Sequence, residues 1–202
     1  MLEVGAGIGA NTRLFANSGF DRWVCLEPEG RLVERIKAGI SSNGASNGAR
    51  HEALVGYLRD LDRARMFDTL LYVDVLEHVE HDQEEVRLAA AHLKPGGALV
   101  VLSPAHSWLY SEFDASIGHF RRYTKATLAA LTLPSLKLEK LIYLDSAGLL
   151  AVLGNRLVLR SKLPSKNQVL FWDNWLVPCS RWLDPLLGYT VGKTVVGVWR
   201  KT

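Results

Sequence analysis

Short apolar runs alternate along the chain with longer segments in which apolar residues recur at helical spacing. The apolar runs are residues 2–4, 23–26, 52–56, 67–73 and 98–102. Segments 11–18, 31–40 and 82–93 lie between them and predict helices, the first with Leu14 and Phe15 facing inward. Because the runs are apolar throughout, they predict parallel strands that helices cover on both faces. A last strand is predicted at residues 194–200.

The pattern changes between residues 138 and 190. Aliphatic residues there mix with basic ones, and three tryptophans follow, namely Trp172, Trp175 and Trp182. Such a segment fits an amphipathic cap that contacts a membrane or a lipid substrate. It fits equally a substrate lid with its apolar face on the core, and we favour this second interpretation. We therefore expect one domain over residues 1–202, with a helical lid or insertion at 138–190.

Composition narrows the class of protein. A chain of 202 residues, 48% hydrophobic and 22% charged, has the size and apolar content of one folded domain. Its formal net charge of +3 comes from basic residues spread along the chain, so we do not expect nucleic acid as a partner. Two cysteines make no disulfide framework, and no uncharged apolar run approaches the roughly 18 residues of a membrane span. We expect a cytoplasmic protein.

A glycine-rich turn follows the first strand and precedes the first helix. Gly5, Gly7 and Gly9 leave room for a ligand to approach the backbone, and the helix that follows offers free amides. Glu27 ends the next strand, roughly 20 residues on, where a ribose-binding carboxylate belongs. These features fit both NAD and S-adenosylmethionine. The alternative is a tight strand–helix turn that binds no ligand.

Four ordered motifs give the sequence a family resemblance. Residues 2–9 carry Glu3 two positions before the first glycine, where a dinucleotide-binding loop normally has an apolar residue. Residues 67–78, 93–97 and 192–201 look like a fourth-strand motif, the turn before a fifth strand and a final antiparallel strand. In this order the motifs resemble class I S-adenosylmethionine-dependent methyltransferases. Within that class, the sequence most resembles small-molecule and lipid-quinone methyltransferases of the ubiquinone-biosynthesis type.

The resemblance implies a fold and a cofactor site. The fold is α/β and Rossmann-like, with a doubly wound, seven-stranded, mostly parallel sheet whose last strand is antiparallel. The cofactor is S-adenosyl-L-methionine. Glu3 would lie near its methionine end, Glu27 would take the ribose hydroxyls, and Asp74 would flank the methyl-donor pocket. The cofactor-binding residues implied are Glu3, Gly5, Gly7, Gly9, Glu27, Asp74 and Leu76.

His78, His106 and His119 are candidate catalytic bases, and we favour His78 and His119. Methyl transfer from a sulfonium needs mainly proximity and alignment, and a base only where the acceptor must lose a proton. His78 follows the fourth strand directly, although it could instead order the loop. His119 lies in the segment 118–124, which relatives place near the substrate. Arg121 and Arg122 of that segment either bind an anionic group of the substrate or form a solvated basic turn.

A metal site is the alternative use of the fourth-strand motif. Asp74, Glu77 and His78 are spaced three and four residues apart, so a helical segment would bring them together. Some quinone methyltransferases hold a divalent cation with a similar cluster. Most class I methyltransferases bind no metal, and we expect none here.

The expected function is S-adenosylmethionine-dependent methylation of a small or lipid-like acceptor by in-line transfer. One alternative is a protein that binds the cofactor but is inactive, such as a partner subunit. Another is an NAD-dependent oxidoreductase, which Glu3 argues against. Met1 falls within the first strand, whereas this class has helices before it. We therefore expect a first strand that is cut short, and a lower thermal midpoint than in a version extended upstream.

Overall fold

A single mixed sheet organises the protein. The computed structural model describes residues 1–15, 19–42, 50–154 and 171–202. The strands are β1 (Leu2–Val4), β2 (Arg22–Glu27), β3 (Arg50–Val55), β4 (Phe67–Val73), β5 (Leu93–Pro104), β6 (Leu136–Leu144) and β7 (Thr194–Lys201). Their order across the sheet is β3-β2-β1-β4-β5-β7-β6. The seven-stranded α/β sheet is therefore as predicted.

Strand direction fixes where a ligand can bind. Strands β1 to β5 are parallel to one another, whereas β7 is antiparallel to both β5 and β6. The prediction of an antiparallel last strand is thus confirmed. The strand order reverses between β1 and β4, and in such sheets ligands bind beyond the carboxyl ends of the strands at that reversal.

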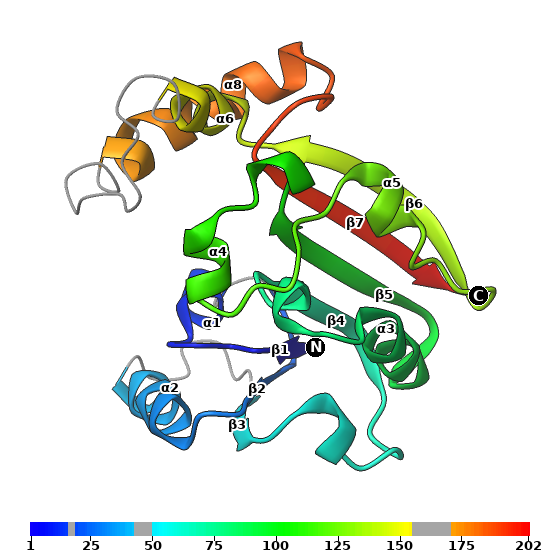
Figure 1. Cartoon of the computed structure of the whole chain (residues 1–202). Coiled ribbons are helices and arrows are strands. Elements are labelled where there is room, and N and C mark those ends of the chain that lie inside the picture. The colour runs from blue at the N-terminus through cyan, green and yellow to red at the C-terminus, as the bar shows by residue number, and fades with distance from the viewer. Residues whose placement is uncertain (16–18, 43–49, 155–170) are drawn as a thin grey trace.

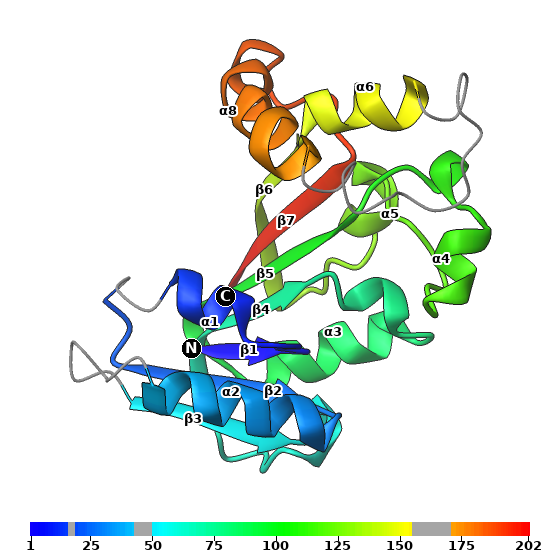
Figure 2. The same ribbon diagram turned by 90° about the vertical axis from the view of Figure 1, so that its left-hand side faces the viewer.

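Helices and short helical turns connect the strands (Figure 1, Figure 2). The helices are α1 (Ala10–Leu14), α2 (Gly30–Ser42), α3 (Asp82–Ala91), α4 (Glu112–Ser116), α5 (Lys125–Ala129), α6 (Ser146–Gly154) and α8 (Val177–Leu186). Short turns are η1 (Leu58–Asp60), η2 (Leu76–His78), η3 (Ser107–Leu109) and η5 (Trp172–Leu176). Helix α2 lies over β2 and β3, and α3 packs against β5 on the other face (Figure 2).

The core has two parts, one on each face of the sheet. The larger one joins strand residues such as Leu70 and Leu99 to Val86 of α3 and Leu128 of α5. The smaller one, on the side of α2, consists of Ala6, Trp23, Cys25, Ile36 and Leu71. Burial of apolar side chains on both faces explains why the parallel strands are continuous apolar runs.

Helix α1 is shorter than predicted and turns a different face inward. It is only five residues long, and Gly9 precedes it with a φ of 72°. Thr12 is its buried residue, whereas Leu14 is 74% exposed and Phe15 40% exposed. The prediction that these two side chains face inward is wrong. Hydrogen bonding of Thr12 to Glu3 turns its side of the helix toward the sheet.

The predicted lid begins later than residue 138, because β6 occupies residues up to Leu144. This strand pairs with β7 alone, so it is an edge strand. Charged residues at Lys137, Glu139 and Lys140 interrupt its apolar pattern, which hid the strand from the sequence reading. The first helix of the segment is α6, and residues 155–170 of the predicted lid lie outside the described residues.

Helices α6 and α8 pack together beyond the ends of β6 and β7 (Figure 1, Figure 2). The Asp184 carboxylate of α8 accepts hydrogen bonds from the amides of Asp145 and Ser146, at 2.8 and 2.9 Å. The Ser180 hydroxyl accepts another from the amide of Ala147. Side chains of α8 thus cap the first turn of α6. Among the described helices, none is long and apolar enough to cross a membrane.

Candidate functional site

The glycine turn after β1 is shaped by left-handed backbone. Gly5, Gly7 and Gly9 have φ angles of 67°, 56° and 72°, which L side chains rarely adopt. A Cβ on Gly5 would lie 2.5 Å from Cγ2 of Val75, in the segment after β4. Only glycine therefore lets this turn approach the end of β4 so closely. The turn lies where the strand order reverses, which is where sheets of this kind bind ligands.

Glu27 lies beside the glycine turn. Its Oε2 accepts a hydrogen bond of 2.9 Å from the amide of Gly7, and its Oε1 accepts one of 3.1 Å from the amide of Glu29. The side chain is largely buried at the end of β2. The carboxylate is thus held next to the loop by two backbone donors. The contact of Glu27 with ribose hydroxyls stays a prediction.

Glu3 is almost fully buried, and three side chains bind its carboxylate. Asn11 Nδ2 donates to Oε1 at 2.9 Å, while Thr12 Oγ1 and Trp23 Nε1 each donate to Oε2 at 3.0 Å. Burial raises the pKa of Glu3, and the three hydrogen bonds oppose that rise. These bonds join β1 to α1 and β2, so Glu3 supports the loop from below. Its contact with the cofactor itself stays a prediction.

Asp74 and Leu76 follow β4 at the same edge of the sheet. Asp74 has a φ of 52°, and its amide donates to Leu102 O at 2.9 Å. Burial raises the pKa of Asp74, and nearby His119 and Lys193 oppose that rise. Leu76 is 1% exposed and belongs to the larger core. Its side chain thus packs inward, and its predicted role at the cofactor rests on backbone atoms.

A buried carboxylate, that of Glu77, lies beside the predicted base His119. Glu77 is fully buried, and its Oε2 accepts a hydrogen bond of 2.7 Å from Ser103 Oγ of β5. Its Oε1 has no hydrogen-bond partner among the described residues and lies 3.9 Å from His119 Nε2. Burial raises the pKa of Glu77 to about 7. A carboxyl of this kind exchanges its proton near neutral pH.

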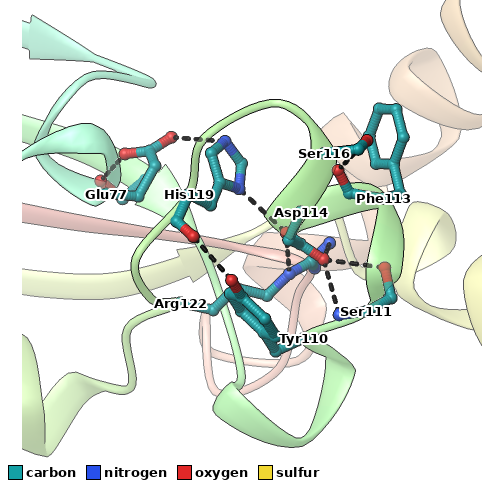
Figure 3. A network of polar contacts seen from close by, with 9 residues as sticks. Glu77, Tyr110, Ser111, Phe113, Asp114, Ser116, His119 and Arg122 are labelled. Atoms are coloured by element: carbon teal, nitrogen blue, oxygen red, sulfur yellow. Dashed lines mark hydrogen bonds and ion pairs between the residues drawn. The ribbon is translucent and has the colours of Figure 1, made fainter.

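His119 is held by a second buried carboxylate (Figure 3). Its Nδ1 lies 2.9 Å from Asp114 Oδ1, and its side chain is 8% exposed. Arg122 donates to both oxygens of Asp114, at 2.7 Å from Nε and 3.1 Å from Nη2. Asp114 lies in α4, whereas His119 and Arg122 follow that helix. The structure therefore joins His119 to Glu77 on one side and to Asp114 on the other.

His78 packs edge-on against His119, with ring centroids 4.5 Å apart. Burial and the neighbouring His119 lower the pKa of His78. His78 and His119, which are 41 positions apart in the sequence, are thus in contact in the structure. His106 is used elsewhere, because its Nε2 is 2.8 Å from Gly192 O. The structure separates it from the pair by this contact.

One group of side chains among the described residues has spacing that suits a metal ion. Glu77, His78 and His119 each offer a ligand atom, and the three atoms lie within 4.8 Å of one another. Asp74, expected in such a cluster from spacing, does not belong to this group. Two imidazoles and one carboxylate suit Zn²⁺ or Fe²⁺ better than Mg²⁺.

Both arginines of the segment 118–124 form internal ion pairs. Arg121 Nη1 lies 2.6 Å from Asp82 Oδ2, and Arg121 Nη2 donates to Glu80 O at 2.7 Å. Arg122 is bound to Asp114. A solvated basic turn is therefore the wrong interpretation, and substrate binding would compete with these pairs.

Sequence comparison identifies the first half of the chain. Residues 2–99 match a family described as Methyltransferase domain. The Ubiquinone biosynthesis O-methyltransferase of Rickettsia conorii is 25% identical over 104 residues, which cover 50% of this chain and 33% of that protein. The match thus spans about a third of the length of this curated relative.

Solved structures agree with the fold over nearly the whole chain. An S-adenosylmethionine dependent methyltransferase from Mesorhizobium loti superposes with a TM-score of 0.65 at 16% identity, covering 99% of this chain and 89% of that one. The N-methyltransferase NodS from Bradyrhizobium japonicum, in complex with S-adenosyl-L-homocysteine, gives 0.60 at 14% identity, with 99% and 76% covered. The family motifs, the domain match and the shared fold agree. Residues 2–99 thus carry a methyltransferase domain, the chain as a whole has the fold of solved S-adenosylmethionine-dependent methyltransferases, and S-adenosyl-L-methionine is the cofactor.

Proposed function

We propose that this protein methylates a small-molecule or lipid-like acceptor. The observation that carries the proposal is one edge of the sheet, where the glycine turn and Glu27 lie next to Asp74, which in turn neighbours His119. A cofactor held at the turn would present its methyl group toward Asp74. The bond from acceptor to methyl carbon forms as the sulfur–carbon bond breaks, and the bonding pair stays on sulfur. The chain supplies alignment for this displacement.

His119 is the base that the geometry favours, ahead of His78. Asp114 holds one nitrogen of the His119 ring, and no hydrogen bond to the other is found in the described part of the chain. The acceptor proton would pass to that second nitrogen, Nε2, as the acceptor attacks the methyl carbon. His78 packs against the ring and would keep it in place.

Aromatic side chains in the segment that contains His119 support an acceptor with an aromatic or lipid-like body. Trp108 and Phe120 are each 51% exposed, and both lie in the segment that joins β5 to α5. Tyr110 of the same segment donates its hydroxyl to His119 O at 2.6 Å. Exposed aromatic residues beside a polar reacting group are typical of sites for small apolar ligands.

Helices α6 and α8 would form the lid of this acceptor site, as expected for the segment up to residue 190. We expect that this protein does not bind nucleic acid. We also expect that it is cytoplasmic. The lid interpretation and contact with a membrane surface differ in their response to liposomes, which gives the test described in the Discussion.

Two measurements test the proposed function. Calorimetry should show binding of S-adenosylhomocysteine and no competing binding of NAD. A panel of hydroxylated aromatic and prenylated acceptors should then release S-adenosylhomocysteine with at least one member. Binding of NAD without response to the sulfur ligands would overturn the proposal. Cofactor binding with no release from any acceptor would instead favour an inactive binding protein.

His119→Ala separates the base from the cofactor site. With the active acceptor, we expect kcat to fall by about 100-fold, because the acceptor keeps its proton. Affinity for S-adenosylhomocysteine should not change. Ser116→Ala is the matched control, since its hydroxyl donates to the nearby Phe113 O and has no contact with His119 among the described residues. Equal rates for the two variants would remove His119 from the reaction.

A further inference from the structure

Asp114 is the most heavily bonded carboxylate of the acceptor side (Figure 3). It is fully buried in α4. Its Oδ2 accepts hydrogen bonds from Ser111 N, Ser111 Oγ and Arg122 Nη2, at 2.9, 2.9 and 3.1 Å. Its Oδ1 receives Arg122 Nε at 2.7 Å and faces His119 Nδ1 at 2.9 Å.

Further contacts fix the loop on which His119 lies. The His119 amide donates to Asp114 O at 2.9 Å, so backbone and side chain of one residue bind the same partner. The amide of Phe120, next along the chain, donates to Glu77 O at 2.8 Å. Arg121 ties the same loop to Asp82. The imidazole therefore has little freedom to rotate or to exchange its partner.

The two nitrogens of the His119 ring have different surroundings. Nδ1 faces a carboxylate that already accepts from an arginine, so the ring nitrogen must be the donor of that contact. Nε2 faces Glu77 Oε1 at 3.9 Å, beyond hydrogen-bond length. In the neutral ring, the proton thus sits on Nδ1 and the lone pair on Nε2.

We propose that Asp114 is a positioning residue that fixes the tautomer of His119, and that the 118–124 segment serves to build this support. The inference rests on the proposed function only for the role of His119 as base. Arg122 then has a role that does not require an anionic substrate, because Arg122 orients Asp114 and Asp114 orients the His119 ring. The acceptor proton goes to Nε2, while the other proton stays on Nδ1, hydrogen-bonded to Asp114, as the methyl group moves to the acceptor.

Asp114→Asn tests this with little change of shape. The asparagine amide can be oriented in two ways. With its nitrogen at the Oδ2 position, that nitrogen would face three hydrogen-bond donors, whereas at the Oδ1 position it would face one, Arg122 Nε, beside the His119 ring. The asparagine should therefore point its oxygen at Ser111 and its nitrogen at His119. That nitrogen donates to Nδ1, so the ring must move its proton to Nε2.

The readout is the tautomer of His119 in a long-range ¹H–¹⁵N spectrum with EDTA present. The spectrum is taken at a pH roughly two units above the ordinary histidine pKa, and His119→Asn assigns the signal. We expect a proton on Nδ1 in the wild type and on Nε2 in Asp114→Asn. A wild-type ring protonated on Nε2 overturns the proposal, even if the variant fails to fold. An unchanged tautomer in a folded Asp114→Asn overturns it too.

Asp82→Asn is the matched control, because it breaks the ion pair of Arg121 in the same loop without touching His119. In Asp82→Asn, His119 should have the same tautomer as in the wild type. A changed tautomer in this control would show that any loosening of the loop is enough to move the proton, and would overturn the role of Asp114. Calorimetry with S-adenosylhomocysteine on the same proteins reports on the proposed function separately. With the active acceptor, Asp114→Asn should lower kcat about 100-fold with little change in KM. A rise in KM alone would assign Asp114 a purely structural role.

Discussion

The proposed cofactor side of this site, around the glycine turn and Glu27, and the proposed acceptor side, around Glu77, Asp114 and His119, are built in different ways. On the cofactor side, the glycine turn has positive φ angles, and the Glu27 carboxylate accepts hydrogen bonds from the backbone amides of Gly7 and Glu29. On the acceptor side, side chains from β5, η2, α4 and the loop after it converge on two buried carboxylates, Glu77 and Asp114. Local sequence thus specifies the first side, whereas tertiary contacts specify the second.

The largest expected effect breaks the cofactor side at the close approach of its loop. Gly5→Ala adds both left-handed strain and a Cβ at 2.5 Å from Val75 Cγ2. Gly7→Ala adds strain alone, since nothing lies within 4 Å of its Cβ position. We expect the free energy of unfolding to fall by about 2–4 kcal/mol for the first and about 1–2 kcal/mol for the second. Urea denaturation measures both, and equal losses would contradict the close approach.

The second prediction concerns pH and the buried Glu77 of the acceptor side. Its pKa is raised from 4.5 to about 7 in the folded protein, so the folded state binds its proton more tightly than the unfolded state. Stability is therefore lost as pH rises from about 4.5 to 7, by about 3 kcal/mol in total. Glu77→Gln keeps a hydrogen-bond acceptor for the Ser103 hydroxyl and removes the group whose ionisation causes this loss of stability.

Denaturation curves of wild type and Glu77→Gln across that pH range check the prediction. The difference in unfolding free energy between the two should grow with pH in favour of the variant, because only the wild type has a buried carboxyl at position 77 to ionise. A constant difference would mean that Glu77 is ionised in the same range whether folded or unfolded.

The third prediction tests the carboxylate of the cofactor side. Glu27→Ala removes the acceptor that faces Gly7 N and, as predicted, the ribose hydroxyls. We expect binding of S-adenosylhomocysteine to weaken by about 1–3 kcal/mol, from loss of charge-assisted hydrogen bonds. Glu34→Ala is the control, because Glu34 is an exposed residue of α2 that pairs with Lys37. Unchanged affinity in calorimetry would exclude Glu27 from the site.

The smallest expected effect on stability lies in helix α8 of the proposed lid. Trp182 and Leu186 of α8 are 80% and 82% exposed. Replacing both by Ser should change the free energy of unfolding by less than about 0.5 kcal/mol. We expect no sedimentation of the wild type with anionic liposomes, and a higher KM for the acceptor in the variant. Sedimentation that the variant loses would favour membrane contact over the lid.

The same division explains how far the sequence could be interpreted. The parallel strands and the glycine turn are local patterns, so their places were predictable, and the antiparallel last strand came with the family resemblance. Asp114 and Ser103 carry no such signal, because an isolated acid or serine acquires its role only when distant segments meet. Strand β6 escaped detection because an edge strand tolerates charged residues on an otherwise apolar pattern.

The last two strands have a consequence for how this protein can be altered. Leu144 at the end of β6 pairs with Thr194 at the start of β7, and Lys193 N donates to Asp145 O at 3.2 Å. The two ends of the segment that carries α6 and α8 therefore lie side by side, where β6 ends and β7 begins. A replacement segment of a different length could join the same two strand ends, with the parallel strands and the glycine turn left in place. Acceptor preference could thus change, in evolution or in the laboratory, by grafting a different segment between β6 and β7.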